Sequence, residues 1–185
     1  APRKSVWPQS TLLSLAMILF ALACGHETLA QQKNDFRPLD LSRFSSTNST
    51  LDADSFPRGA QTFGGIPFTI GGVIELTGIE AARHGEFMPP QIMAMPVNQK
   101  AQRLHLLLGA LHGQRDGTPL ANLVLHFADG ETRAMRISFG VHTRNCFGES
   151  GGKAVPLADP NSRMCWENGT NTPELRLFQT ALDNP

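Results

Sequence analysis

The chain has 185 residues with 16 basic and 16 acidic side chains, so its formal net charge is zero. Nucleic-acid binding needs a basic face that neutralises phosphates, and a neutral chain argues against a nucleic acid as partner. The hydrophobic fraction of 41% is enough for a folded core, and 17 glycines and 13 prolines with few charges favour short strands joined by turns.

The first 30 residues have the three parts of a secretory signal. Arg3 and Lys4 precede an apolar run, residues 11–24, which is too short to span a bilayer, and small residues follow. Cleavage after Ala30 releases a soluble domain of residues 31–185. Cleavage before Cys24, at a string that resembles an imperfect bacterial lipobox, instead leaves a lipid anchor on Cys24. We expect export to the periplasm, cell envelope or medium, with membrane contact only through such an anchor.

In the exported part, alternation of apolar and polar residues predicts strands. Asp129-Gly130 marks a tight hairpin between two of them, and Pro38 marks an edge strand. Gly71-Gly72 predicts a bulge or a close backbone contact. In chain order the predicted strands are 36–41, 67–76, 92–95, 103–112, 121–128, 132–142 and 174–180.

The strand at 103–112 is apolar on both faces apart from its histidines, which predicts a central position. Residues 42–58 and 145–172 are polar and rich in turn formers, which predicts two long loops. An antiparallel two-sheet sandwich is the simplest fold that buries the apolar faces of these predicted strands. The fold class expected is therefore all-β.

Two cysteines remain after signal removal, Cys146 and Cys165. In an oxidising compartment an even pair favours a disulfide, which would be worth roughly 3 kcal/mol in the chain-entropy model. The alternative is two buried thiols that never meet.

Four strings resemble those of bacterial secreted domains of the galactose-binding-like (jelly-roll) group, similar to the carbohydrate-binding modules that accompany glycoside hydrolases. They are Pro57–Ile70, Lys100–Ala110, Leu123–Gly130 and Leu175–Thr180. The resemblance implies a jelly-roll sandwich over the whole exported part, an extracytoplasmic role and, commonly, carbohydrate binding. Such domains usually have one further strand where this chain ends, so we expect either a missing strand or a sheet edge open to a partner.

Sugar binding requires an aromatic platform and planar polar side chains. Trp166 and Glu167 belong to the second predicted loop, and a second polar group follows the predicted hairpin. A Cys146–Cys165 disulfide would bring both groups to one rim of the sandwich. The predicted ligand residues are Trp166, His142, Arg144, Asn145 and Glu167. The alternative for Trp166 is that it plugs the end of the sandwich.

Enzymatic chemistry has weaker signals. His126 and His142 flank the hairpin but have no third ligand for zinc, and no nucleophile elbow or phosphate loop is present. We predict no catalytic residue, metal or cofactor, and leave a structural Ca²⁺ open. Loop acids that would serve a glycosidase are Asp129, Glu131, Glu149, Asp159, Glu167 and Glu174.

The leading interpretation is an exported non-enzymatic binding module that recognises a glycan or an envelope protein through rim loops. The first alternative is an assembly subunit of a cell-envelope complex that uses an open sheet edge after Thr180. The second is a carboxylate-dependent glycoside hydrolase.

Overall fold

The computed structural model divides the chain into two units, residues 1–35 and 36–185, and describes only residues of the second. The described residues are 36–47, 49, 51–78, 82–85, 88–148, 155–169 and 174–184. The predicted signal, Cys24 and Glu149 lie outside them. Among the described residues, no helix is long and apolar enough to cross a membrane.

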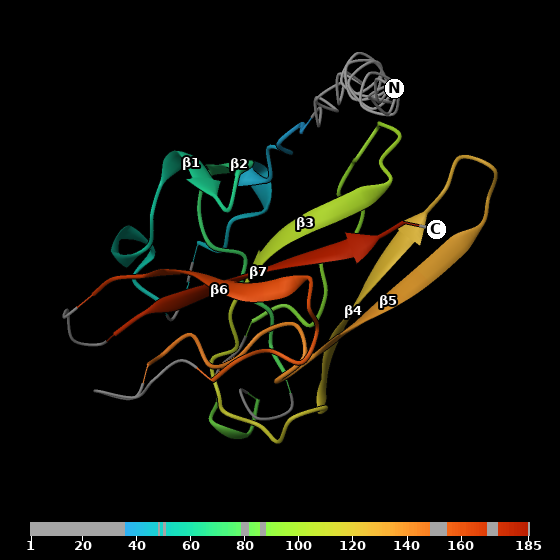
Figure 1. The fold of residues 1–185 in the computed structure, drawn as a ribbon. Coiled ribbons are helices and arrows are strands. Elements are labelled where there is room, and N and C mark those ends of the chain that lie inside the picture. The colour runs from blue at the N-terminus through green and yellow to red at the C-terminus, as the bar shows by residue number, and fades with distance from the viewer. Residues whose placement is uncertain are drawn as a thin grey trace, which may run out of the picture. The chain divides into compact units, whose positions relative to one another are not determined.

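The described unit is all-β, as predicted, with antiparallel sheets and two short 3-10 helices (Figure 1). The helices are η1 (Ser42–Phe44) and η2 (Ala53–Ser55). The strands are β1 (Gly59–Phe63), β2 (Ile66–Ile70), β3 (Arg103–Leu108), β4 (Pro119–His126), β5 (Thr132–Ser138), β6 (Ser162–Glu167) and β7 (Arg176–Asp183).

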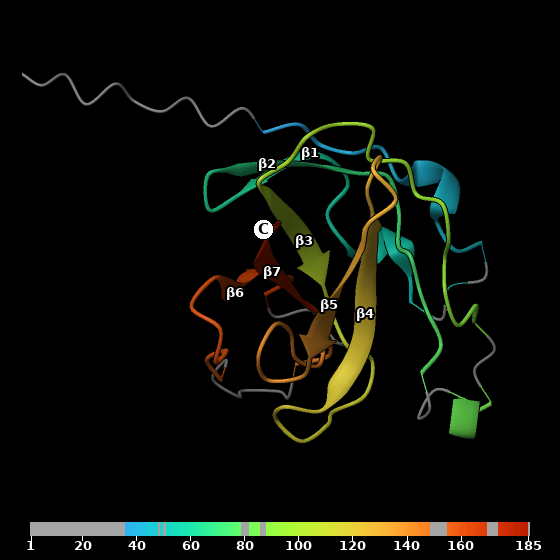
Figure 2. The same ribbon diagram turned by 90° about the vertical axis from the view of Figure 1, so that its right-hand side faces the viewer.

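The strands form the hairpins β1–β2 and β4–β5 and a three-stranded sheet in the order β3-β7-β6. In Figures 1 and 2 the β1–β2 hairpin lies above the three-stranded sheet, and the β4–β5 hairpin lies to its right. Buried residues come from β5 and β7 alike, such as Ile137 (6% exposed), Phe178 (2%) and Thr180 (0%).

The predicted hairpin is confirmed. Phe127 and Glu131 close the β4–β5 turn through a backbone hydrogen bond, and Gly130 has the positive φ of 90° that the turn requires. Asp129 Oδ1 accepts a hydrogen bond from the Glu131 amide at 3.0 Å. The sequence signal is local here, so it could be read without knowledge of the rest of the fold.

The predicted central position of residues 103–112 is wrong. Strand β3 lies at one edge of its sheet, and β7 occupies the centre between β3 and β6. Beyond Thr180, β7 continues by pairing Ala181 with His105 and Leu182 with Leu104. On its β3 side, β7 is therefore paired beyond Thr180 as well.

Strand β6 lies within residues 145–172, which were predicted to form a loop. Its turn begins at Asp159, whose carbonyl accepts the Ser162 amide and whose Oδ1 accepts the Asn161 amide at 3.0 Å. Pairing then runs from Ser162 opposite Thr180 to Glu167 opposite Arg176, with an irregularity between Met164 and Trp166.

Two other predicted strands, 36–41 and 92–95, are irregular backbone, and the predicted strand 67–76 ends at Ile70. At Gly71 the chain passes close to η1, because a Cβ there would lie 2.8 Å from the Ser42 Cβ. Of the two alternatives for Gly71-Gly72, the close contact is the one found, and side chains at these positions would push the segments apart.

Candidate functional site

Arg144, predicted as a ligand residue, is bound within the protein. Its Nη1 and Nη2 donate to Asp116 Oδ1 and Oδ2, both at 2.9 Å, and Nη2 also donates to the Pro156 carbonyl at 3.1 Å. Its guanidinium lies 5.8 Å from the centre of the Phe139 ring. These bonds hold the pKa of Asp116 below its ordinary value. Arg144 therefore joins three segments of chain.

His142 and Asn145 stabilise their own loop. His142 Nδ1 accepts a hydrogen bond from the Ser138 amide at 3.0 Å, and Asn145 Oδ1 accepts one from the Phe147 amide at 3.1 Å. His126, opposite Thr132, lies at the turn end of the hairpin, whereas Ser138 lies at its other end. His126 and His142 therefore lie at opposite ends of the hairpin.

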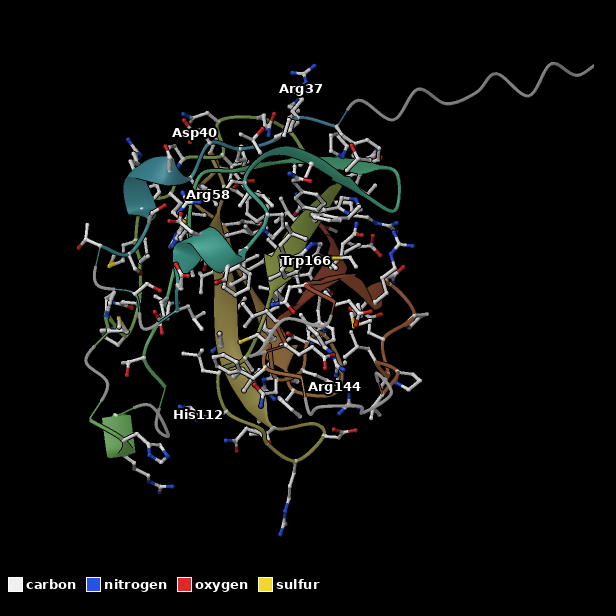
Figure 3. All side chains as sticks on the ribbon, turned by 90° about the vertical axis from the view of Figure 1, so that its left-hand side faces the viewer. Arg37, Asp40, Arg58, His112, Arg144 and Trp166 are labelled. Carbon is white, nitrogen blue, oxygen red and sulfur yellow. The ribbon has the colours of Figure 1, made fainter. Side chains whose placement is uncertain are left out.

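Trp166 and Glu167 lie in strand β6. The Trp166 ring packs against buried Phe56, with 6.0 Å between ring centres. Glu167 Oε2 lies 4.0 Å from Arg176 Nε, and the same guanidinium bonds Glu174. Figure 3 shows Trp166 and Arg144 well apart, so the structure does not gather the predicted residues into one site.

The predicted disulfide is absent, and Cys146 and Cys165 are both free thiols. Cys146 meets β7 from the β3 side, where its carbonyl accepts the Arg176 amide, whereas Cys165 belongs to β6 and donates from Sγ to the Leu177 carbonyl at 3.5 Å. Segments on the two sides of one strand are ~9–10 Å apart, which is too far for a disulfide. Burial raises the pKa of both thiols to about 11.

A pocket of about 190 Å³ lies instead on the three-stranded sheet, beneath β2. We call it the sheet pocket. Strand pairing explains its walls, because Arg163 lies opposite Gln179 and His105 opposite Ala181. Alternate residues of a strand share a face, which adds Arg103. The lining residues that matter below are Ile66, Arg103, His105, Asn161, Arg163 and Gln179.

Arg163 fixes the β1–β2 hairpin over this face. Its Nη2 donates to the Gly64 carbonyl at 3.3 Å and to Gln179 Oε1 at 3.1 Å. Gly64 and Gly65 both have positive φ, which suits a two-residue hairpin turn. A side chain at Gly64 would also displace the Arg163 guanidinium from this position.

His105 also lines the sheet pocket, and one of its ring nitrogens forms no hydrogen bond among the described residues. Its Nδ1 is buried and has no hydrogen-bond partner among the described residues, while its ring meets Phe36 edge-on at 5.6 Å between centres. Burial, then the charges of Arg103 and Arg163, lower the pKa of His105. The imidazole is therefore neutral at pH 7, beside two cations of which Arg103 is paired with Asp183 at 2.6 Å.

Sequence reasoning missed this pocket because its walls come from β2, β3, β6 and β7. The available signal was Arg103 and His105 two residues apart on one predicted strand. A second histidine pair, His84 and His112, stacks with 5.0 Å between ring centres. The described part of the chain contains no group of three or more residues able to hold a metal ion.

The acids proposed for a hydrolase have other contacts in the described residues. Glu167 and Glu174 share Arg176, Asp129 and Asp159 accept turn amides, and Glu131 lies 3.6 Å from Arg133. Comparison of the chain with protein-family models, curated proteins and solved structures finds no match. A function for this chain therefore rests on its own residues.

Proposed function

We propose that the chain is an exported, non-enzymatic carbohydrate-binding module of the two-sheet sandwich (jelly-roll) type, and that its sugar site is the sheet pocket rather than the rim loops. The observation that carries this proposal is the convergence of two arginines, a histidine and two amides in one pocket. Planar side chains of this kind are suited to hydrogen bonds with sugar hydroxyls.

The size of the sheet pocket favours a small ligand. Its volume of about 190 Å³ equals roughly six water molecules at ~30 Å³ each, below the ~300–1,000 Å³ typical of drug-sized sites. One sugar ring at a chain end or branch fits this limit. Since the described lining includes the His105 imidazole but no Phe or Trp side chain, binding would depend on hydrogen bonds more than on stacking.

Other findings support the parts of this proposal that concern fold and export. The antiparallel sheets and the buried residues shared between β5 and β7 agree with a two-sheet sandwich. The basic, apolar and small-residue sequence of the first 30 residues supports export. The hydrolase alternative is weaker, because Glu167 and Glu174 both pair with Arg176.

An envelope assembly subunit is the second candidate, and strand β4 favours it. Among the described residues β4 pairs only with β5, and it exposes Leu120 (37%) and Val124 (47%). An exposed strand with apolar side chains can add a strand from a partner. Size-exclusion chromatography of the full chain distinguishes this role, since a partner-free monomer that binds sugar argues against it.

A glycan array probed with the full chain tests the main proposal. We expect wild-type protein to bind a defined set of glycans, Arg163→Gln to lose them, and Arg58→Gln to retain them. Arg58 is a suitable control because it is an exposed arginine paired with Asp54 away from the pocket. Equal binding by wild type and Arg163→Gln would contradict the pocket assignment.

A further inference from the structure

We infer that the sheet pocket selects a sugar that carries a carboxylate, a uronic acid unit, over its neutral counterpart. This inference rests on the proposed function and adds the chemical class of its ligand. It rests on the charges around the pocket, on the neutral hydrogen-bond partners of Arg163 and on His105, whose Nδ1 has no partner among the described residues.

The pocket has an excess of one positive charge. Arg103 is paired with Asp183, whereas every partner of Arg163 in the described residues is neutral, namely the Gln179 amide oxygen and the Gly64 carbonyl. A guanidinium without a counter-ion favours an anion. Hydrogen bonds between a guanidinium and a carboxylate are roughly twice as strong as neutral ones.

The Arg163 guanidinium is also held in place before any ligand arrives. Nε and Nη2 both bond Gln179 Oε1, at 3.3 and 3.1 Å, and Nη2 bonds Gly64 on the hairpin above. A donor fixed in this way loses little side-chain entropy on binding, which favours recognition of a planar carboxylate.

His105 provides the feature that favours a sugar over a simple anion. His105 lines the pocket together with Arg103 and Arg163, and its Nδ1 is buried without a partner among the described residues. An imidazole can accept a hydrogen bond from a sugar hydroxyl or donate one to it, according to the tautomer. A carboxylate on Arg163 together with a hydroxyl on His105 requires both groups on one small ligand.

The charges also set a pH dependence. The groups facing His105 are Arg103, Arg163 and Asp183, and burial and the two arginines lower its pKa. Protonation of His105 below its lowered pKa adds a positive charge beside a bound carboxylate. Affinity for the anionic sugar should therefore rise as the pH falls through the lowered pKa of His105, while affinity for a neutral sugar should not.

The test is calorimetric titration of the full chain with three separate probes: D-glucuronate, D-glucose and acetate. We expect glucuronate to bind about tenfold or more tightly than glucose or acetate. Arg163→Gln should remove most of this preference, and Asp183→Asn should increase it because it removes the carboxylate paired with Arg103.

Arg103→Gln and Arg58→Gln form a matched pair, since both arginines are about half exposed, 47% and 48%, and both pair with an aspartate. Only the first should weaken glucuronate binding. Circular dichroism checks that each variant is folded, and Arg103→Gln replaces Arg163→Gln as the test if the latter is not.

Each other outcome overturns a defined part. Equal affinity for glucuronate and glucose overturns the carboxylate preference but leaves the carbohydrate-binding proposal standing. If acetate binds as tightly as glucuronate, the pocket is a general anion site, and the assignment of a sugar as its ligand is overturned. No binding of any probe, with an array also negative, overturns both the inference and the proposed function.

Discussion

Arg144 and Asp116 face each other through two parallel hydrogen bonds of 2.9 Å. The pair joins the segment that precedes β4 to the segment that follows β5, and the Pro156 carbonyl adds a third segment to the same guanidinium. Only 16% of the Arg144 side chain is exposed, against 63% for Asp116. A bidentate pair of this kind restricts both partners more than a single contact does.

Arg144→Ala should therefore lower the midpoint of thermal unfolding more than Arg58→Ala does. Arg58 makes a single surface ion pair with Asp54, and exposed pairs of that kind contribute little. Differential scanning calorimetry of the two variants measures the difference. Equal midpoints would show that the Arg144 contacts add nothing beyond a surface ion pair.

The same pair predicts a pH dependence of stability. Hydrogen bonds from Arg144 lower the pKa of Asp116 in the folded protein, so the unfolded chain takes up this proton first as the pH falls. The contribution of Asp116 is present above about pH 4 and is lost as the pH falls through the lower folded-state value. Urea unfolding of wild type and Asp116→Asn should differ at pH 7, and the difference should shrink as the pH falls below about 4. A constant difference would contradict this.

Several elements could be predicted from the sequence because their signals are local. The Asp129-Gly130 turn specifies the β4–β5 hairpin, and apolar alternation identifies β7 to within a few residues. Strand β6 escaped prediction because Ser162–Glu167 contains no β-branched residue, and its pairing partner is β7, which follows in sequence. Its strand character comes from non-local pairing, which overrides weak local preference.

The partners of the predicted ligand residues could not be read from the sequence for a related reason. His142, Arg144 and Asn145 have the chemistry of a sugar site, but sequence does not show that Ser138, Asp116 and Phe147 already satisfy them. The disulfide failed because β7 lies between the two cysteine segments. The sheet pocket could not be predicted because it depends on which strands are neighbours. Alternation of apolar and polar residues reveals only which residues share a face of one strand.

The buried Cys146 thiol and the half-buried Cys165 thiol should react slowly in the folded protein. Burial raises the pKa of Cys146 and Cys165 to about 11, so few thiolates exist at pH 8, and reactivity should increase as the pH approaches 11. Alkylation of a Cys24→Ser variant, followed by mass spectrometry, should modify both thiols only after unfolding. Thiols that resist alkylation after unfolding without a reductant would instead indicate a disulfide.

Phe178 lies on the central strand of the three-stranded sheet and is 2% exposed. Phe178→Ala removes a large buried side chain and should destabilise the protein by about 3–5 kcal/mol. Phe127→Ala, at the β4–β5 turn, is a control because that ring is only half-buried. Urea unfolding measures both, and a Phe178 effect no larger than the Phe127 effect would place the core elsewhere.

Trp166→Ala distinguishes a rim site from the sheet pocket. The ring packs on buried Phe56, 6.0 Å between centres, and does not line the pocket. Since Trp166 is half-buried, its loss should destabilise the fold by about 2–3 kcal/mol, less than the loss of a fully buried aromatic ring.

Binding of glucuronate by the remaining folded protein should be unchanged, because the pocket contacts of Arg163 and His105 do not involve Trp166. Titration at 10 °C, with circular dichroism to check that the variant is folded, measures that affinity. Loss of binding without loss of stability would return the ligand site to Trp166, whereas loss of stability with full binding assigns the indole to the packing of β6 against the segment that contains η2.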